Sequence, residues 1–580
     1  MSRGWNGLQP FSRKLYEETY FIPGEDYEGW LRRVSSAYAN DSQHADRMAT
    51  YIRNYHFHPS TPISSNAGTD RGLPISCFTK KVYDNKPSIF KNYNESFNLG
   101  AFGGGIGTGW SDVREVNHPV GVHGGSSSGL IPFLGISDRS TLAISQGGLR
   151  RASEAAYLHI SHPEIEEFID LRLPTGDQNR RAPNLHHGIA IPDAFMIAME
   201  ARESWDLISP KSGEVVKTVD AYDLWCKILE VRATIKGEPY LLFIDTVNRL
   251  SPDEYKIDEV EIEISNLCTE IMLRTDDKHS GVCCLGSVNA EYYDEWKGNI
   301  DQFIADCSDY LDNVLQAFIV QTEDLDGFER ARAGAIDERS IGLGLMGLHS
   351  YYQKNSIPWE SMMAKSANIR IFSSMKKASD DHQVALDSPC PMAIRTLSHK
   401  RNIHVFAVAP TMSISSLCDL ASSGIEPWLA NTFVKKVKQG TFAVRNKFLT
   451  EVIEEESIDH DYKWLSNQWE SIKKHDGSVQ HLEWMSDWDK EVFKTAHEID
   501  QRYIIEQAAD RTPFICQGQS VNIFLPANSH VRDIYGIHVM AWKKGVKSLY
   551  YLRSTASSRA STSSGERKTI EYDDDCLACQ

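Results

Sequence analysis

The clearest alternation of polar and apolar positions runs through Glu259-Val260-Glu261-Ile262-Glu263-Ile264. Alternation with period two and β-branched residues predicts a half-buried strand whose even positions face inward. Since every second side chain of a strand lies on one face, the same parity brings Asn266, Cys268 and Glu270 together on the buried side. A tight loop with Cys268 at its tip would also bring these groups together, and the pattern does not distinguish the two arrangements.

A thiol flanked at two-residue spacing by an amide and a carboxylate favours chemistry over packing. A buried structural cysteine is the alternative, because Cys packs like a small hydrophobic residue. That alternative gives no reason to bury the carboxylate of Glu270, which is costly without a partner. We therefore predict a catalytic site around Cys268.

Helical and strand-like periods alternate along the rest of the chain. Apolar residues recur at i, i+3, i+4 and i+7 from Tyr27 to Val34, which predicts a helical region over residues 1–60. A similar stripe over 301–320 includes Cys307, which we assign to the core. Short apolar strands between such helices predict an α/β fold with parallel pairing. Residues 547–553 have the pattern of one more strand.

Three glycine-rich stretches, 98–110, 123–129 and 146–153, allow a backbone to approach a ligand closely. The first contains no G-x-G-x-x-G and is not followed by the Gly-Lys-Ser/Thr of a P-loop, so a Rossmann or P-loop site is excluded there. The three stretches suggest a nucleotide held by loops instead. Hydroxyl-rich loops at 60–69 and 409–416 have the composition of phosphate-binding loops.

Composition narrows the function classes. With a formal charge of −18 and a pI near 5.6, the 580-residue chain lacks the basic surface of a nucleic-acid-binding protein. No apolar run is long enough for a membrane span, and the first residues lack a signal-peptide core. Eleven scattered cysteines do not form a disulfide framework, so we expect reduced thiols and a cytoplasmic protein. The acidic, Trp-rich segment 450–500 predicts solvated surface helices.

No metal site is predicted in this chain. The only Cys-x-x-Cys is Cys576 to Cys579 at the C-terminus, and a zinc site needs a second pair. A di-iron bundle repeats Glu-x-x-His, which occurs once, at Glu115 and His118. The terminal pair follows a Ser- and Thr-rich tether, residues 554–564, which favours thiol–disulfide exchange.

Together these motifs resemble the catalytic (large, alpha) subunit of ribonucleotide reductase, class I most closely, over roughly residues 60 to 430 and the C-terminal stretch. The resemblance implies a ten-stranded α/β barrel of two five-stranded halves, with Cys268 on a central finger loop. It implies a helical region over 1–60, a catalytic barrel over 61–552 and a flexible redox-active tail over 553–580. The family replaces the ribose 2′-hydroxyl of a ribonucleoside diphosphate or triphosphate with hydrogen.

The resemblance also implies catalytic roles. Cys268 would form the thiyl radical that takes the 3′-hydrogen. Asn266 and Glu270 would bind the ribose hydroxyls, with Glu270 as the base. Cys77 and Cys283 would reduce the 2′ carbon and end as a disulfide.

Further implied roles concern redox partners. Cys284 stands where many relatives have Asn, so a pairing through Cys284 stays open. The mobile tail pair would re-reduce the active-site disulfide and would itself be reduced by thioredoxin or glutaredoxin. Tyr550 and Tyr551 match the stacked tyrosines that receive a radical from a separate, metal-containing small (beta) subunit.

Nucleotide contacts are implied as well. The substrate-binding positions are Thr61, Ser76, Thr411 and Ser413. The effector-binding positions are Asp84, Ser88 and Arg114. The specificity loop, 147–154, includes Gly147, Gly148, Arg150 and Ser153. The effectors would be ATP, dATP, dTTP and dGTP, and the subunit would form a homodimer.

Two alternatives remain open at this point. Asn66-Ala67-Gly68 and Ile414 resemble the adenosylcobalamin-dependent class II enzymes. A nucleotide-binding regulatory paralogue without turnover would keep the loops, but it would not need Cys268 or the terminal pair. The residues before Thr61 are too few for an ATP-cone domain, so we expect no inhibition by dATP through such a domain.

Overall fold

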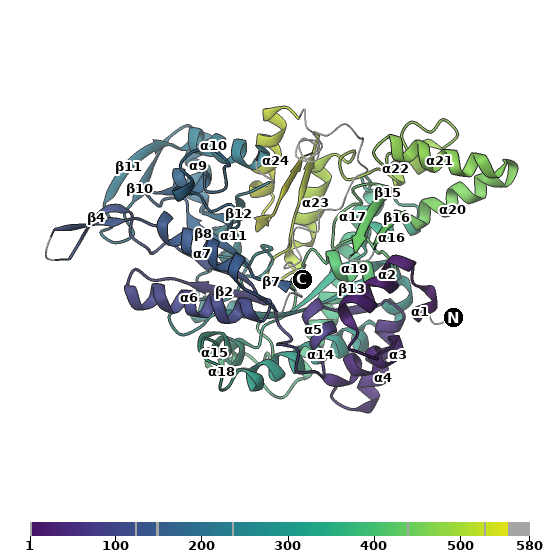
Figure 1. The fold of residues 1–580 in the computed structure, drawn as a ribbon, viewed down its shortest axis with the longest axis horizontal. Coiled ribbons are helices and arrows are strands. Elements are labelled where there is room, and N and C mark those ends of the chain that lie inside the picture. The colour runs from purple at the N-terminus through teal and green to yellow at the C-terminus, as the bar shows by residue number, and fades with distance from the viewer. Residues whose placement is uncertain are drawn as a thin grey trace.

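The structure, a computed structural model, describes residues 3–121, 124–146, 150–234, 237–437, 440–526 and 529–554 (Figure 1). Its first segment is helical, as the apolar spacing predicts. Helix α3 (Tyr27–Ala37) begins where the Asp26 carboxylate accepts a hydrogen bond from the Gly29 amide, and α4 (Ser42–Arg53) begins with the same kind of cap. The apolar stripe of α3 is buried, so these helices pack against the body of the protein.

Five parallel strands form the first half of a barrel. Their order is β2 (Cys77–Lys81), β3 (Gly105–Gly109), β8 (Ser153–His159), β9 (His186–Ile191) and β12 (Tyr240–Phe243). Parallel neighbours need crossover connections, which are largely helical here. The connecting helices are α6 (Lys86–Ala101), α7 (Ile131–Ala143), α8 (Ile165–Ile169), α9 (Asp193–Ala201) and α10 (Ala221–Thr234).

The second half contains β13 (Gly281–Asn289), β14 (Ile341–Met346), the extended segments 404–408 and 517–521, and β18 (Ser548–Leu549). Strand β13 pairs with β14 in parallel, and isolated parallel bridges join Leu343 to Phe406 and Val408 to Gln519. The Tyr550 amide then donates to the Val521 carbonyl at 2.8 Å.

Two antiparallel seams, β13 with β2 and β18 with β12, join the halves and close the ring. The prediction of a ten-stranded barrel of two five-stranded halves is therefore confirmed. The helices that cover the second half include α14 (Ile300–Gln321), α15 (Glu329–Glu338), α17 (Met362–Ala385), α23 (Gln501–Arg511) and α24 (Val531–Lys543). The 301–320 helix is thus α14, and Cys307 is buried in the core as predicted.

Shorter elements complete the chain. The helices are α1 (Gly4–Gly7), α2 (Pro10–Leu15), η1 (Tyr16–Tyr20), α5 (Thr61–Asn66), η2 (Gln178–Arg180), α11 (Ile244–Arg249), α12 (Asp253–Ile257), η3 (Ala290–Tyr292), α13 (Tyr293–Trp296), η4 (Lys297–Asn299), α16 (Leu348–Lys354), α18 (Pro391–Arg395), α19 (Met412–Leu417), η5 (Ser457–Asp459) and η6 (Thr512–Phe514). The strands are β1 (Phe57–Pro59), β4 (Val116–Val120), β5 (Gly125–Ser128), β6 (Ser145–Gln146), β7 (Arg150–Arg151), β10 (Ser204–Ile208), β11 (Val215–Asp220), β15 (Thr432–Val437), β16 (Gly440–Arg445), β17 (Ile523–Leu525) and β19 (Leu552–Ser554).

Three expectations about local structure are wrong in whole or in part. The alternating segment 259–264 forms no ladder and is an irregular stretch, although Ile262 and Ile264 are buried as the alternation predicts. Within 98–110, residues 105–109 are not a nucleotide-binding loop but the buried strand β3. The predicted strand over 547–553 is interrupted at Tyr550 and Tyr551, where β18 ends before β19 begins.

Segment 450–500 has a small core of its own. It contains α20 (Lys447–Glu456), α21 (Tyr462–Lys474) and α22 (Asp487–Val492), which lie at the edge of the molecule in Figure 1. Their Trp469 is buried with Ile453 and Ile472, so part of the tryptophan content packs a satellite cluster rather than facing water. Across the described ranges, no helix is long and apolar enough to cross a membrane.

Candidate active site

The finger loop, residues 258–280, leads from α12 to β13 and carries Cys268 at its tip. The Thr269 amide donates to the Asn266 carbonyl at 3.3 Å, and Thr269 has a φ of 64°, in the left-handed region. A non-glycine residue in that region marks a tight, locally strained turn. The arrangement is therefore the loop alternative, with Cys268 at a turn instead of on a strand.

Both halves of the barrel hold the backbone carbonyls of this turn. The Tyr157 hydroxyl on β8, in the first half, donates to the Asn266 carbonyl at 2.7 Å. From the second half, the Ser520 hydroxyl donates to the Cys268 carbonyl at 2.6 Å and the Ser548 hydroxyl to the Thr269 carbonyl at 3.0 Å. Buried carbonyls need such donors, so these bonds fix the position of Cys268.

Glycine on β3 lets the loop cross close to the sheet. A Cβ on Gly107 would lie 1.8 Å from the Ser265 carbonyl oxygen, and one on Gly109 would lie 2.8 Å from the side chain of Ile264. No larger residue fits at Gly107 without moving the loop. The glycine content of this segment therefore serves the finger loop.

Asn266 and Glu270 converge beside Cys268, as the residue spacing predicts. The Asn266 Oδ1 accepts hydrogen bonds from the amides of Glu270 and Ile271, both at 3.1 Å. The Glu270 side chain is buried, and neither carboxylate oxygen has a hydrogen-bond partner of good geometry among the described residues. Burial raises the pKa of Glu270 to about 7, partly opposed by Asn266 and Ser520 nearby. A buried carboxyl of this kind can gain or lose a proton at neutral pH.

Cys77 and Cys283 face each other across the seam between the halves. They are direct partners in the antiparallel register of β2 and β13, and both are buried thiols. Directly opposed residues of an antiparallel pair have Cα atoms about 4.5–5.5 Å apart, which is within the range that a disulfide spans. Burial raises the pKa of Cys283, so its thiol keeps its proton at neutral pH.

Cys284 lies on the opposite face of β13. Its thiol donates to the Leu311 carbonyl of α14 at 3.1 Å and packs in the outer core. Because adjacent residues of a strand point to opposite faces, Cys284 is directed away from Cys77. This geometry supports Cys283, and not Cys284, as the partner of Cys77.

Three tyrosines pack beside Cys268. The ring centroids of Tyr550 and Tyr551 are 4.1 Å apart, and Tyr240 on β12 lies 4.9 Å from Tyr550 and 5.2 Å from Tyr551. Tyr550, Tyr240 and Cys268 belong to one buried cluster. Burial raises the pKa of Tyr551 to about 12, so its phenol is protonated at neutral pH. A phenol that does not ionise at neutral pH is oxidised to a neutral radical by losing a proton and an electron together.

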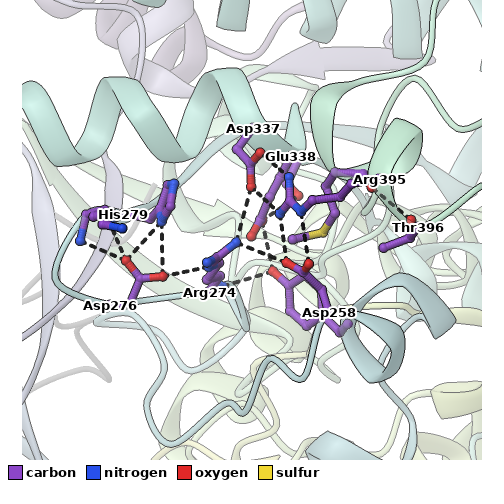
Figure 2. Close-up of polar contacts among 12 residues, drawn as sticks. Asp258, Arg274, Asp276, His279, Asp337, Glu338, Arg395 and Thr396 are labelled. Atoms are coloured by element: carbon purple, nitrogen blue, oxygen red, sulfur yellow. Dashed lines mark hydrogen bonds and ion pairs between the residues drawn. The ribbon is translucent and has the colours of Figure 1, made fainter.

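An ion cluster closes the base of the finger loop, as Figure 2 shows. Asp258 at the start of the loop and Arg274 near its end form an ion pair of 3.2 Å, and Arg274 also approaches Asp337 of α15. Arg395 of α18 bridges Asp258 and Asp337 from the other side. The cluster ties the two ends of the loop to each other and to two helices.

The predicted effector-binding residues lie together. Asp84 accepts two hydrogen bonds from the Arg114 Nε, at 2.9 and 2.8 Å, and Lys211 lies 3.6 Å from its carboxylate. Partial burial opposes ionisation of Asp84, but the bonds and charge of Arg114 outweigh it and lower the pKa of Asp84. Ser88, in the first turn of α6, accepts a hydrogen bond from the Tyr83 amide at 2.9 Å.

The predicted substrate-binding residues occupy three segments. Thr61 is the first residue of α5, and its hydroxyl lies 3.1 Å from that of Tyr20. Ser76 directly precedes Cys77. Thr411 precedes α19 and accepts a hydrogen bond from the Gly424 amide at 2.6 Å, and Ser413 lies in that helix.

Part of the predicted set lies outside the described residues, namely Gly147, Gly148, Cys576 and Cys579. Arg150 belongs to β7, which pairs with β6 in an antiparallel hairpin, and Ser153 begins β8.

Sequence reasoning missed Tyr157, Tyr240 and Ser520. Tyr240 begins the apolar run Tyr240-Leu241-Leu242-Phe243, and nothing in that run separates it from a core residue. Ser520 lies more than 200 residues from Cys268, so only the barrel topology brings them together.

Comparisons with known proteins agree with this geometry. Residues 75–382 and 398–552 match the ribonucleotide reductase barrel domain, and residues 6–72 match the all-alpha domain of the same enzymes. The ribonucleoside-diphosphate reductase large subunit of Invertebrate iridescent virus 3 is 33% identical over 99% of this chain and 98% of its own. A protein of Frog virus 3 (isolate Goorha), which is provisionally named a ribonucleoside-diphosphate reductase large subunit, is 40% identical over 92% of this chain and 92% of its own.

A solved structure gives the same result. The Actinobacillus ureae class Id ribonucleotide reductase alpha subunit superposes with a TM-score of 0.84 at 31% identity, covering 97% of this chain and 99% of its own. The chain therefore belongs to the ribonucleotide reductase family. Within that family it is a large, catalytic subunit of the class I type, which relies on a separate small subunit for its radical. The class II alternative and the non-enzyme alternative are not supported.

We predict that Gly107→Ala lowers turnover at least 100-fold. The added methyl group would overlap the Ser265 carbonyl and displace the loop tip that carries Cys268. Gly536→Ala on α24 is the matched control, since its Cβ would meet no atom within 4 Å and alanine favours helix. Steady-state kinetics with thermal melts checks both variants, and full activity of a folded Gly107→Ala protein would contradict the close approach.

Proposed function

We propose that the finger-loop tip reduces ribonucleotides, with Cys268 as the thiyl radical that takes the 3′-hydrogen of the ribose. Asn266 and Glu270 bind the ribose hydroxyls, and Glu270 accepts the 3′-hydroxyl proton. The 2′-hydroxyl leaves as water, while Cys77 and Cys283 supply two electrons and two protons and form a disulfide. Cys268 then returns the hydrogen to the 3′ carbon, so that its radical is restored.

The observation that carries this proposal is the convergence of three groups at one turn. Cys268 packs with Tyr550 on one side, and Ile271, three residues along the loop, packs with Cys77 and Cys283 on the other. A reductase of this kind needs a radical entrance, a hydrogen-abstracting thiol and a reducing dithiol within one enclosed space. The buried Cys283 thiol, whose raised pKa keeps it protonated, suits hydrogen donation.

Radical entry is assigned to Tyr551 and Tyr550, in that order. Tyr551 is only half-buried, whereas Tyr550 is fully buried and shares a cluster with Cys268. The stacked pair supports stepwise transfer from a metal-containing small subunit docked outside. Because the viral relatives are named as ribonucleoside-diphosphate reductases, we infer diphosphate substrates.

Asp84, Ser88 and Arg114 are assigned to a site for nucleotide effectors such as ATP, dATP, dTTP and dGTP, and the β6–β7 hairpin to the specificity loop. Large apolar side chains are exposed on the neighbouring helices α6 and α7. These are Phe90, Phe97, Ile136 and Leu142. Exposed apolar side chains on two packed helices support a homodimer through this face.

Thr61, Ser76, Thr411 and Ser413 are assigned to substrate phosphate and ribose. Cys576 and Cys579 are assigned to re-reduction of the Cys77–Cys283 disulfide, followed by exchange with thioredoxin or glutaredoxin. Chemistry that depends on reduced thiols supports a cytoplasmic location.

We predict that Cys268→Ser abolishes deoxynucleotide formation while substrate and effector binding persist. Serine nearly conserves the shape of the side chain but does not form the radical under these conditions. Product assays and equilibrium binding of a ribonucleoside diphosphate check this, with Cys226→Ser on α10 as a control that keeps activity. A Cys268→Ser protein that turns over would remove the central assignment.

Tyr550→Phe and Tyr551→Phe should each be inactive in the presence of the small subunit, because phenylalanine cannot be oxidised at an accessible potential. Tyr310→Phe removes an equally buried hydroxyl, which donates to the Val34 carbonyl, and should stay active. Activity assays and substrate binding distinguish lost radical transfer from lost structure. Turnover by either tyrosine variant comparable to wild type would exclude that residue from the route.

The pKa of Glu270 predicts a pH dependence. If Glu270 must be ionised to act as the base, kcat/KM should fall as the pH drops below about 7. In the unfolded chain the Glu270 carboxyl has an ordinary pKa of about 4.3, so between that pH and about 7 only the folded protein holds the proton. The free energy of unfolding that Glu270 contributes is therefore present below about pH 4.3 and is lost as the pH rises to about 7. Glu270→Gln should lower kcat/KM by roughly 100-fold or more and remove the inflection. An unchanged pH profile in that variant would contradict the role of base.

A further inference from the structure

A buried chain of polar side chains lies between helix α6 and the first half of the barrel, away from the catalytic turn. It contains Lys80 on β2, Thr108 on β3, Glu154 on β8 and Ser96 on α6, none of which is more than 6% exposed. Since β2, β3 and β8 are consecutive neighbours in the sheet, the chain crosses three strands beneath one helix.

Ser96 joins the two charges of this chain. The Lys80 ammonium donates to the Asn92 carbonyl of α6 at 2.7 Å and to the Ser96 hydroxyl. The Ser96 hydroxyl in turn donates to the Glu154 carboxylate at 3.1 Å, whose other oxygen accepts from Thr108 at 2.6 Å. One hydroxyl group on the helix therefore connects an ammonium group and a carboxylate on two different strands.

Such an arrangement is poorly explained by stability alone. Two buried charges lose hydration, and well-packed apolar residues of the same volume are often as stable or more stable. Burial lowers the pKa of Lys80 to about 8, while Glu154 and Glu95 oppose that shift, so the charge is kept at neutral pH. What buried charged groups can provide is a fixed relative position of the elements that carry them.

The position of α6 suggests what is being coupled. At its N-terminal end lie the proposed effector residues, with Ser88 in the first turn and Asp84 just before the cap, Asn85. At its C-terminal end, a Cβ on Gly100 would lie 2.8 Å from the Cβ of Ala152, which connects the β6–β7 hairpin to β8. Glu154 is two residues beyond Ala152. The same helix thus touches the proposed effector site and the root of the proposed specificity loop.

We propose that Lys80, Ser96 and Glu154 are specificity-determining residues, which couple the position of α6 to β8 and so to the hairpin that selects the substrate base. The inference rests on the proposed effector site at Asp84, Ser88 and Arg114. An effector that shifts α6 must either move Glu154 together with the helix or break the hydrogen bonds that Ser96 makes with Lys80 and Glu154. Hydrogen bonds to charged groups are stronger than those between neutral groups, so breaking them is the costlier course. Ser96 is a positioning residue in this scheme and touches neither nucleotide.

Ser96→Ala tests the coupling, because it removes the joining hydroxyl and leaves both charges. The measurement is the ratio of kcat/KM for CDP to that for GDP, with the small subunit present, under ATP and under dTTP, together with the dissociation constant of each effector. In wild type we expect this ratio to change at least tenfold between effectors. In Ser96→Ala we expect the change to fall below threefold, with effector affinity and effector-free turnover within twofold of wild type.

Two further variants separate coupling from damage. The double variant Lys80→Met with Glu154→Gln removes both charges together and should also lose the effector-dependent change without stranding a buried ion. Asn94→Ala is the control on the same helix, since it removes an exposed amide that donates to the Asp326 carboxylate at 3.3 Å. It should retain the full change in ratio.

The outcomes distinguish the two proposals. A full effector-dependent change in Ser96→Ala and in the double variant overturns the coupling and leaves the effector site standing. If these variants lower the turnover of CDP and GDP equally under every effector, the ratio still responds to the effector, and the coupling is likewise overturned while the effector site stands. A wild-type ratio that does not respond to any effector overturns the effector site itself, and the coupling falls with it.

Discussion

The hydrogen bonds that hold the carbonyls of the finger-loop turn are the interactions on which the rest of the site depends. Tyr157 belongs to the first half of the barrel, whereas Ser520 and Ser548 belong to the second. Buried carbonyls without partners are costly, so the turn is stable only where donors from both halves meet. The position of Cys268 therefore depends on closure of the barrel. At Gly107, a side chain would overlap the Ser265 carbonyl and prevent the loop from taking this position.

Charged groups of the finger loop and its base fall into two kinds. The cluster of Asp258, Arg274 and Arg395 at the base of the loop is paired throughout, as befits a fixed support (Figure 2). Glu270, by contrast, is buried with both oxygens lacking well-formed bonds among the described residues. Paired charges hold elements in place, while a carboxyl with unused acceptors and a pKa near neutrality is suited to bind hydroxyl groups and move protons.

Sequence reasoning found the elements that depend on local patterns. The stripe of α3, the helix α14 and the inward parity of Ile262 and Ile264 follow from periodicity, and the thiol between an amide and an acid marks the catalytic turn. Features that depend on contacts between distant segments were not visible. The sequence of strand β3 resembles a ligand-binding loop, but its Gly107 is needed because the Ser265 carbonyl, about 160 residues away, passes close to it. Tyr240 is recognisable as part of the site only once β12 lies beside Tyr550. The direct register of Cys77 with Cys283, and the opposite direction of Cys284, likewise need the strand pairing.

The central claim is that one turn brings together the hydrogen-abstracting thiol and the dithiol that is consumed. It is tested most directly by a single turnover of fully reduced protein carrying Cys576→Ser and Cys579→Ser, with the small subunit and no external reductant, followed by mass-spectrometric mapping of disulfides. We expect one Cys77–Cys283 disulfide for each deoxynucleotide formed, with Cys268 and Cys284 still reduced. A disulfide through Cys284, or product formed without oxidation of Cys77 and Cys283, would contradict the claim.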